Sequence, residues 1–130
     1  MKLFLRRISS ISNSLTPSRV EALEALIGGN RSIELLRGQL CKFDFDSHPL
    51  VTLRVDHVVD LLSRFVEGEL ASSYVEGWAD LVEVRDDVSF DPAHEAVIKQ
   101  AVHDLANPLL SGPLGKEAAN DMLQMLRKER

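Results

Sequence analysis

The densest group of side chains that could do chemistry lies at residues 85–91, where the chain reads Arg-Asp-Asp-Val-Ser-Phe-Asp. Three carboxylates within six residues, those of Asp86, Asp87 and Asp91, could bind a divalent cation or act as a general acid–base pair. A metal site needs further ligands in the right geometry, and the sequence places none. The same residues suit a helix end, because the last aspartate precedes a proline and the arginine can pair with a neighbouring acid. We favour this structural interpretation over a partner contact, and a partner contact over metal binding or catalysis.

The histidines and the single cysteine do not form a metal-binding motif. No two histidines have the spacing of a zinc-binding pair on one helix face. The four are His48, His57, His94 and His103. Cys41, being alone, can form no internal disulfide and contributes to no cysteine-based zinc site. The sequence therefore predicts no metal ligands and no cofactor, and a lone cysteine favours the cytoplasm.

Known sequence motifs for calcium, phosphate or nucleophilic chemistry are incomplete or missing. Residues 44–46 begin like a calcium loop, but its sixth and twelfth positions hold Pro49 and Val55 instead of glycine and glutamate. The glycine pair at 28–29 lacks the Lys-Ser/Thr ending of a phosphate-binding loop. No nucleophile-elbow serine motif occurs either. We predict no catalytic residues and a protein that is not an enzyme.

Apolar residues recur at helical spacing along most of the chain. A first helix is expected to begin at Thr16-Pro17 and to end at the glycines 28–29, and Asn30 can cap a second. Residues 42–46 alternate between polar and apolar, which is compatible with a short extended segment. A third helix ends at Gly68. Its apolar stripe is continuous: Val55, Val58, Val59, Leu62, Phe65 and Val66.

A fourth helix is predicted to be strongly amphipathic, with an acidic outer face. Ser73 and Glu76 have the spacing of a capping box at its start. At 100° per residue, its apolar face consists of Tyr74, Trp78, Leu81 and Val82. Nearly opposite lie Glu76, Asp80, Glu83 and Asp87. The tryptophan and tyrosine could anchor an interface, but their place on the apolar stripe favours core packing.

The remaining signals complete an all-α fold. A fifth helix is expected to begin at Asp91-Pro92 and to end at Asn107-Pro108, and residues 109–115 form a turn region rich in proline and glycine. A last helix has four inward residues, which are Ala119, Met122, Leu123 and Leu126. We predict a single domain spanning residues 1–130, built as an irregular bundle of about six helices.

Charge is distributed unevenly along the chain. The net charge is −5, but residues 1–43 carry +4, residues 44–95 carry −10 and residues 96–130 carry +1. A nucleic-acid binder needs a basic surface to displace counterions from phosphates, so the acidic middle argues against that class. It suits a basic partner or simple solubility. No apolar run approaches the ~20 residues of a membrane span, so we expect no membrane insertion.

Two stretches resemble a known class of protein. Residues 78–88 read Trp-Ala-x-Leu-x-x-x-Arg-Asp-Asp-Val, and residues 105–114 read Leu-Ala-Asn-Pro-Leu-Leu-Ser-Gly-Pro-Leu. Together they resemble small helical immunity proteins of bacterial toxin–immunity systems, including contact-dependent growth inhibition. The similarity spans residues 53–126 and carries over no individual functional residue. It implies a cytoplasmic protein that binds one toxin domain tightly and blocks its active site or its access to substrate.

An acidic surface would speed the encounter with a basic toxin domain, such as a nuclease. The residues that we expect to form this partner-binding surface are Glu76, Asp80, Glu83, Asp86, Asp87 and Asp91. The alternative is a helical regulatory or scaffold domain that binds proteins but no toxin. A third hypothesis, a hydrolase that uses Asp86, Asp87 and Asp91, would require metal-dependent activity. The oligomeric state stays open at this stage.

Overall fold

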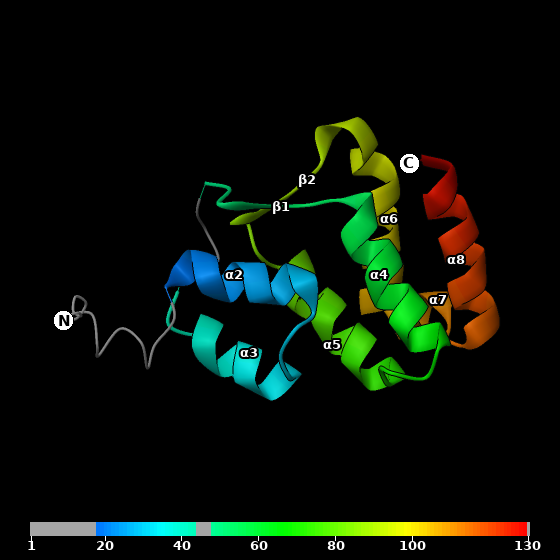
Figure 1. The fold of residues 1–130 in the computed structure, drawn as a ribbon, viewed down its shortest axis with the longest axis horizontal. Coiled ribbons are helices and arrows are strands. Elements are labelled where there is room, and N and C mark those ends of the chain that lie inside the picture. Colours follow the sequence, from blue (N-terminus) through cyan, green and yellow to red (C-terminus); the bar gives the residue numbers. More distant parts are fainter. Residues whose placement is uncertain (1–17, 44–47, 130) are drawn as a thin grey trace, which may run out of the picture.

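The computed structural model describes residues 18–43 and 48–129, and these residues are mostly helical (Figure 1). The all-α prediction is therefore confirmed, and each of the six expected helices is present. In the described residues the elements are, in chain order, α2 (Arg19–Gly28), α3 (Ile33–Leu40), β1 (Val51–Leu53), α4 (Val55–Val66), α5 (Ser72–Glu83), β2 (Val88–Phe90), the 3-10 helix η1 (Pro92–His94), α6 (Glu95–Ala106), α7 (Pro108–Ser111) and α8 (Lys116–Glu129).

Local hydrogen bonds define both ends of α2. The Ser18 hydroxyl accepts from the Glu21 backbone N–H at 3.1 Å, and the Glu21 carboxylate accepts from the Ser18 backbone N–H at 2.9 Å. These bonds to Ser18 lower the pKa of the Glu21 carboxyl. The predicted start at Thr16-Pro17 lies outside the described residues. Gly29 ends the helix in the left-handed conformation, with φ of 63°, as the glycine pair predicts.

The starts of α3 and α4 are also capped by polar groups. Ser32 caps α3, because its hydroxyl accepts from the Leu35 backbone N–H at 3.1 Å. The prediction that Asn30 is this cap is wrong by two residues. At α4 the ring nitrogen Nδ1 of His57 accepts from the Arg54 backbone N–H at 2.9 Å. Burial and the charge of Arg54 lower the pKa of His57, which keeps the accepting nitrogen unprotonated.

Two short strands that the sequence analysis did not predict pair in parallel. Val51 lies opposite Val88, and the hydroxyls of Thr52 and Ser89 lie 3.2 Å apart on the same ladder. Parallel neighbours require a crossover connection, and α4 and α5 supply it. Figure 1 shows the pair lying across one side of α2, where it joins two distant parts of the chain.

The helices pack around one continuous apolar core. α5 lies along α6, α4 lies along α8, and α2 packs against α3 (Figure 1). Every helix from α2 to α6, together with α8, contributes buried side chains, so the predicted apolar faces do turn inward. The largest fully buried side chain is Trp78. This agrees with the preference for core packing over an interface role.

The structure corrects the predicted bounds of α5. The helix begins at Ser72 and its N-cap is Ala71, which has no side-chain oxygen, so the capping box of Ser73 and Glu76 does not form. The chain leaves the helix after Glu83 and turns into β2. Positions beyond Glu83 therefore do not follow the 100° helical rotation that the sequence analysis applied to Asp87.

Two loop predictions also change. Lys42 and Phe43 lie in a turn that follows α3, with the Phe43 backbone N–H donating to the Leu40 carbonyl at 3.0 Å, so they are not extended. The rest of the predicted extended segment, residues 44–46, lies outside the described residues. In the predicted turn region 109–115, the first residues belong instead to the one-turn helix α7, which Gly112 ends.

Candidate protein-binding surface

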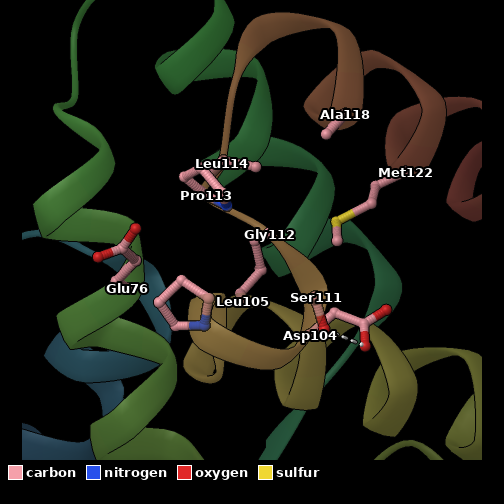
Figure 2. A pocket seen from close by; sticks show the side chains of 10 residues that line it. Glu76, Asp104, Leu105, Ser111, Gly112, Pro113, Leu114, Ala118 and Met122 are labelled. Atoms are coloured by element: carbon pink, nitrogen blue, oxygen red, sulfur yellow. Dashed lines mark hydrogen bonds between the residues drawn. The ribbon is translucent and has the colours of Figure 1, made fainter.

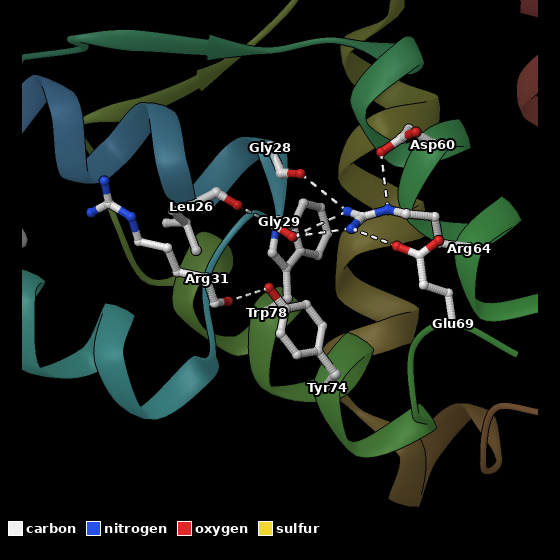
Figure 3. A network of polar contacts seen from close by, with 9 residues as sticks. All are labelled: Leu26, Gly28, Gly29, Arg31, Asp60, Arg64, Glu69, Tyr74 and Trp78. Atoms are coloured by element: carbon white, nitrogen blue, oxygen red, sulfur yellow. Dashed lines mark hydrogen bonds and ion pairs between the residues drawn. The ribbon is translucent and has the colours of Figure 1, made fainter.

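Hydrogen bonds from α5 to the end of α2 and to the α2–α3 turn fix the helix that carries most of the predicted binding residues (Figure 3). The Trp78 indole N–H donates to the Leu26 carbonyl at 2.7 Å, and the Tyr74 hydroxyl donates to the Arg31 carbonyl. Burial raises the pKa of Tyr74. The inner face of α5 is packed over its whole length, with buried side chains of Val75, Trp78, Ala79 and Val82. The outer face of α5 is therefore held in a defined orientation.

Arg64 of α4 strengthens the same region. Its guanidinium donates to the carbonyls of Gly28 and Gly29 at 3.1–3.2 Å, where α2 ends (Figure 3). A positive charge at this end of a helix is favoured by the helix dipole. Asp60 lies 3.2 Å from Nε without a hydrogen bond to it, and Glu69 lies 3.5 Å from Nη1. The side chain of Arg64 is only 18% exposed. Arg64 therefore ties α4 to the turn on which α5 rests.

Four of the predicted carboxylates lie on or just after α5 and face outward. Asp80, Glu83 and Asp86 are exposed, and Glu76 is half-buried. Among the described residues, no lysine or arginine forms an ion pair with any of the four. The Glu83 carboxylate lies 2.9 Å from the Nδ1 atom of His103 on α6. The structure thus brings together an outward acidic ridge, defined here as Glu76, Asp80, Glu83 and Asp86.

Asp87 is not part of this ridge, which corrects the sequence prediction. It is fully buried, and its Oδ1 and Oδ2 atoms accept from Arg85 at 3.0 Å each. Arg19 of α2 also donates to Oδ2 at 3.0 Å. The pairing of Arg85 with a neighbouring acid was expected, but the contribution of Arg19, 68 positions away, was not. Asp87 therefore joins α2 to the start of β2 and offers no surface to a partner.

Asp91 has a structural role as well. Its Oδ1 atom accepts from the Ala93 backbone N–H at 3.1 Å and caps the 3-10 helix η1, whereas the α-helix that was predicted to begin at Asp91-Pro92 begins at Glu95. Its own backbone N–H donates to the Leu53 carbonyl at 2.9 Å, which extends the contact between the strands. The side chain is half-buried and lies beyond the acidic ridge in the chain. The main role of Asp91 is therefore to cap a helix, and of its two carboxylate oxygens only Oδ2 is not used in this cap.

The carboxylates of residues 86–91 do not assemble into a metal site. Asp86 is exposed, Asp87 is bound between two guanidinium groups and Asp91 caps a helix. In the part of the chain that the structure describes, no group of three histidine, cysteine, aspartate or glutamate residues is placed to hold a metal ion. The geometry of these three side chains thus gives no support to the hydrolase hypothesis.

A cavity beside Glu76 was not foreseen from the sequence. It has a volume of about 90 Å³ and lies where α5, α6, α7 and α8 meet (Figure 2). Glu76 projects from α5 at one side of the α7–α8 connection, and Asp104 projects from α6 at the other. Much of the remaining wall is apolar and includes Leu105, Leu114 and Met122. Because the wall comes from four elements, no local pattern could have indicated it.

Two further features lie near the ridge. A more open cavity of about 480 Å³ is bounded by Phe90 and by α6, with Glu83 and His103 in its wall. On α7, the side chains of Leu109 and Leu110 are 100% and 78% exposed. The sequence offers one indication of this exposure. The two leucines stand in a segment rich in proline and glycine, where no helical spacing of apolar residues predicts that they are buried.

No protein-family model, curated protein or solved structure matches this chain. The resemblance of residues 78–88 and 105–114 to immunity proteins accordingly stays a prediction. Among the described residues, no helix is both long enough and apolar enough to cross a membrane.

Proposed function

We propose that this chain is an immunity protein that binds a cognate toxin domain of basic charge and neutralises it. The single observation that carries the proposal is the acidic ridge of Glu76, Asp80, Glu83 and Asp86. These carboxylates face outward from a tightly packed helix, and none is ion-paired with a described lysine or arginine. Negative charge that no described lysine or arginine neutralises, held on a rigid surface, attracts a basic partner over several ångströms and orients it before contact.

The physical reasoning also sets the direction of each effect. Charges at the rim of an interface mainly raise the association rate, and salt screens them over about 8–10 Å. A basic nuclease domain would be attracted for the same reason that it binds phosphates. Once bound over α5, the protein would block the toxin's active site or the entry of its substrate. This blocking step follows from the resemblance to immunity proteins rather than from a contact in the structure.

The test compares two triple variants that change the net charge equally. One reverses the exposed ridge charges: Asp80→Lys, Glu83→Lys and Asp86→Lys. The other reverses three exposed glutamates on α2, on α3 and after α4: Glu24→Lys, Glu34→Lys and Glu67→Lys. The binding partner is the toxin domain encoded immediately upstream of this chain's gene, measured by surface plasmon resonance and by rescue of growth.

We expect the ridge variant to associate at least about tenfold more slowly than the unaltered protein at low salt, and this difference should shrink as the salt concentration rises. The control variant should change the rate much less, because its charges lie on α2, on α3 and after α4 rather than on the ridge. Equal rates for the two variants would show that the ridge is not the binding surface. Absence of any binding or protection by the unaltered protein would contradict the toxin assignment itself.

A further inference from the structure

One carboxylate of the acidic ridge lies against a histidine. The Oε2 atom of Glu83 on α5 is 2.9 Å from the Nδ1 atom of His103 on α6, the helix that lies along α5 (Figure 1). The side chain of His103 is 52% exposed and that of Glu83 is 35% exposed, so both reach solvent. Glu83 therefore belongs to the ridge and also to a pair that joins two helices.

This contact determines where the imidazole carries its first proton. An ionised carboxylate can only accept hydrogen bonds, so Nδ1 of His103 must carry a proton in order to bond with Glu83. The Asn107 amide donates to the His103 backbone carbonyl at 2.7 Å, and the same Nδ2 atom lies 3.3 Å from Nδ1. With Nδ1 protonated, Asn107 bonds to the carbonyl alone. A second proton therefore binds at Nε2 and turns the imidazole into a cation that stays beside Glu83.

The charged groups around the imidazole keep their charge in the range in which a histidine titrates. Lys99 on α6 lines the same open cavity as Glu83 and His103, and β2 contributes the uncharged Phe90. Asp104, the next residue of α6, accepts bonds from two other side chains. Lysines and carboxylates retain their charge between about pH 5.5 and 8, where histidine changes its charge. Protonation of His103 therefore adds one positive charge to the ridge, and neither Glu83 nor Lys99 compensates for it.

We propose that His103 is a pH-dependent switch for the charge of the acidic ridge: as the pH falls, its protonation neutralises Glu83 and slows the association of a basic partner. The inference rests on the proposed function, since that partner is the basic toxin domain. Association rates follow the charge of the surface that meets the partner, and the imidazolium cancels one of four carboxylates. The loss of one charge slows association by about two- to fourfold at low salt.

The first experiment measures the association rate of the upstream-encoded toxin domain at low salt between about pH 8 and 5.5. The toxin domain itself titrates, so each variant is compared with the unaltered protein at the same pH. His103→Gln keeps a donor for Glu83 but takes up no proton, so at the lower pH it should associate about two- to fourfold faster than the unaltered protein. His103→Arg is always cationic and should associate about two- to fourfold more slowly at the higher pH.

The matched control is His94→Gln. His94 lies 3.1 Å from Glu129 of α8 in a similar pair, and neither residue belongs to the ridge. This variant should follow the unaltered protein at every pH, and the fluorescence of the buried Trp78 shows whether each variant is folded. If His103→Gln also follows the unaltered protein while reversal of the ridge charges still slows binding, the inference is overturned and the proposed function stands.

The second experiment tests the ridge without any toxin. The probe is an octalysine peptide, titrated at low salt into the isotopically labelled full chain, and its affinity is read from the NMR amide signals of residues 76–86. The unaltered protein should bind the peptide about two- to fourfold more weakly at the lower pH, whereas His103→Gln should bind it equally at both.

Two results with octalysine would overturn the inference. One is equal affinity of the unaltered protein at the two pH values, and the other is an equal loss of affinity in His103→Gln. If octalysine behaves as expected but the toxin domain does not bind, the proposed function fails while the switch in ridge charge stands.

Discussion

Replacing Asp87 with asparagine should destabilise the fold strongly while leaving the acidic ridge intact. The carboxylate is fully buried, and its oxygens accept bonds of 3.0 Å from Arg85 and from Arg19. Asparagine keeps the size of the side chain but removes the negative charge between two guanidinium groups. The side chain of Arg85 is only 1% exposed, so water cannot take the place of that charge.

The magnitude follows from the burial of each partner. Removing one member of a buried ion pair costs about 3–5 kcal/mol, because the other charge stays buried. Here the lower end applies, since the side chain of Arg19 is 26% exposed and asparagine still accepts a hydrogen bond. We therefore expect a loss of about 3 kcal/mol. For a chain of this length that lowers the melting temperature by roughly 10–15 °C.

Urea unfolding followed by the fluorescence of Trp78 measures this loss directly, because the chain has one tryptophan and it is fully buried. The matched control is Asp86→Asn, the same change at the exposed neighbouring position, which should stay within about 0.5 kcal/mol of the unaltered protein. Adding Arg85→Met to Asp87→Asn should cost less than the sum of the two single changes.

Two results would refute the reasoning on Asp87. One is equal stability of Asp87→Asn and Asp86→Asn, which would mean that the buried carboxylate contributes nothing. The other is strict additivity of the Arg85 and Asp87 variants, which would mean that these side chains do not interact. If Asp87→Asn keeps its stability but no longer binds the toxin, Asp87 belongs to the binding surface after all.

Three further predictions concern stability. Burial and the charge of Arg54 lower the pKa of His57 below its usual 6.5, so the unfolded state binds a proton on this imidazole more readily than the folded state does. The free energy of unfolding should therefore fall as the pH drops below 6.5. His57→Gln should reduce this pH dependence, measured by urea unfolding between about pH 7.5 and 5.5. Arg64→Met should lower the free energy of unfolding by about 1.5–3 kcal/mol in the same assay, because the glycine carbonyls at the end of α2 lose a charged hydrogen-bond donor. A loss near zero would mean that water replaces the guanidinium. Gly38→Ala should raise the free energy of unfolding by about 0.5–1 kcal/mol, because the added Cβ would meet nothing within 4 Å. Gly77→Ala should not stabilise the protein, because its Cβ would lie 3.2 Å from an isoleucine of α3. Equal gains in the two variants would contradict the packing of α5 against α3.

The helices could be predicted because each is encoded by neighbouring residues. The stripe from Val55 to Val66 appears as α4, and the Asn107-Pro108 pair ends α6 as expected. Cap positions are less certain from sequence, because several polar residues near a helix start can serve. Ser32 caps α3 although Asn30 stands just before it, and α5 begins at Ser72 with no side-chain cap. Such shifts of one or two residues change little in the core.

The candidate site could be predicted only in part. The outward direction of Asp80 and Glu83 follows from helical rotation, and the structure places both on the surface. The same rotation fails for Asp87, because α5 ends at Glu83 before the rule reaches it. The cavity beside Glu76 has no counterpart in any local pattern, since its wall draws on four elements.

The amino-acid sequence alone determined the helical content, the apolar face of each helix and the acidic middle of the chain, because these depend on residues within a few positions of one another. Tertiary structure alone decided which carboxylates reach solvent. Asp87 is buried and accepts a hydrogen bond from Arg19, 68 positions earlier, and β1 meets β2 only after a crossover of two helices. Contacts of this kind depend on how whole elements pack, which no short window of sequence specifies.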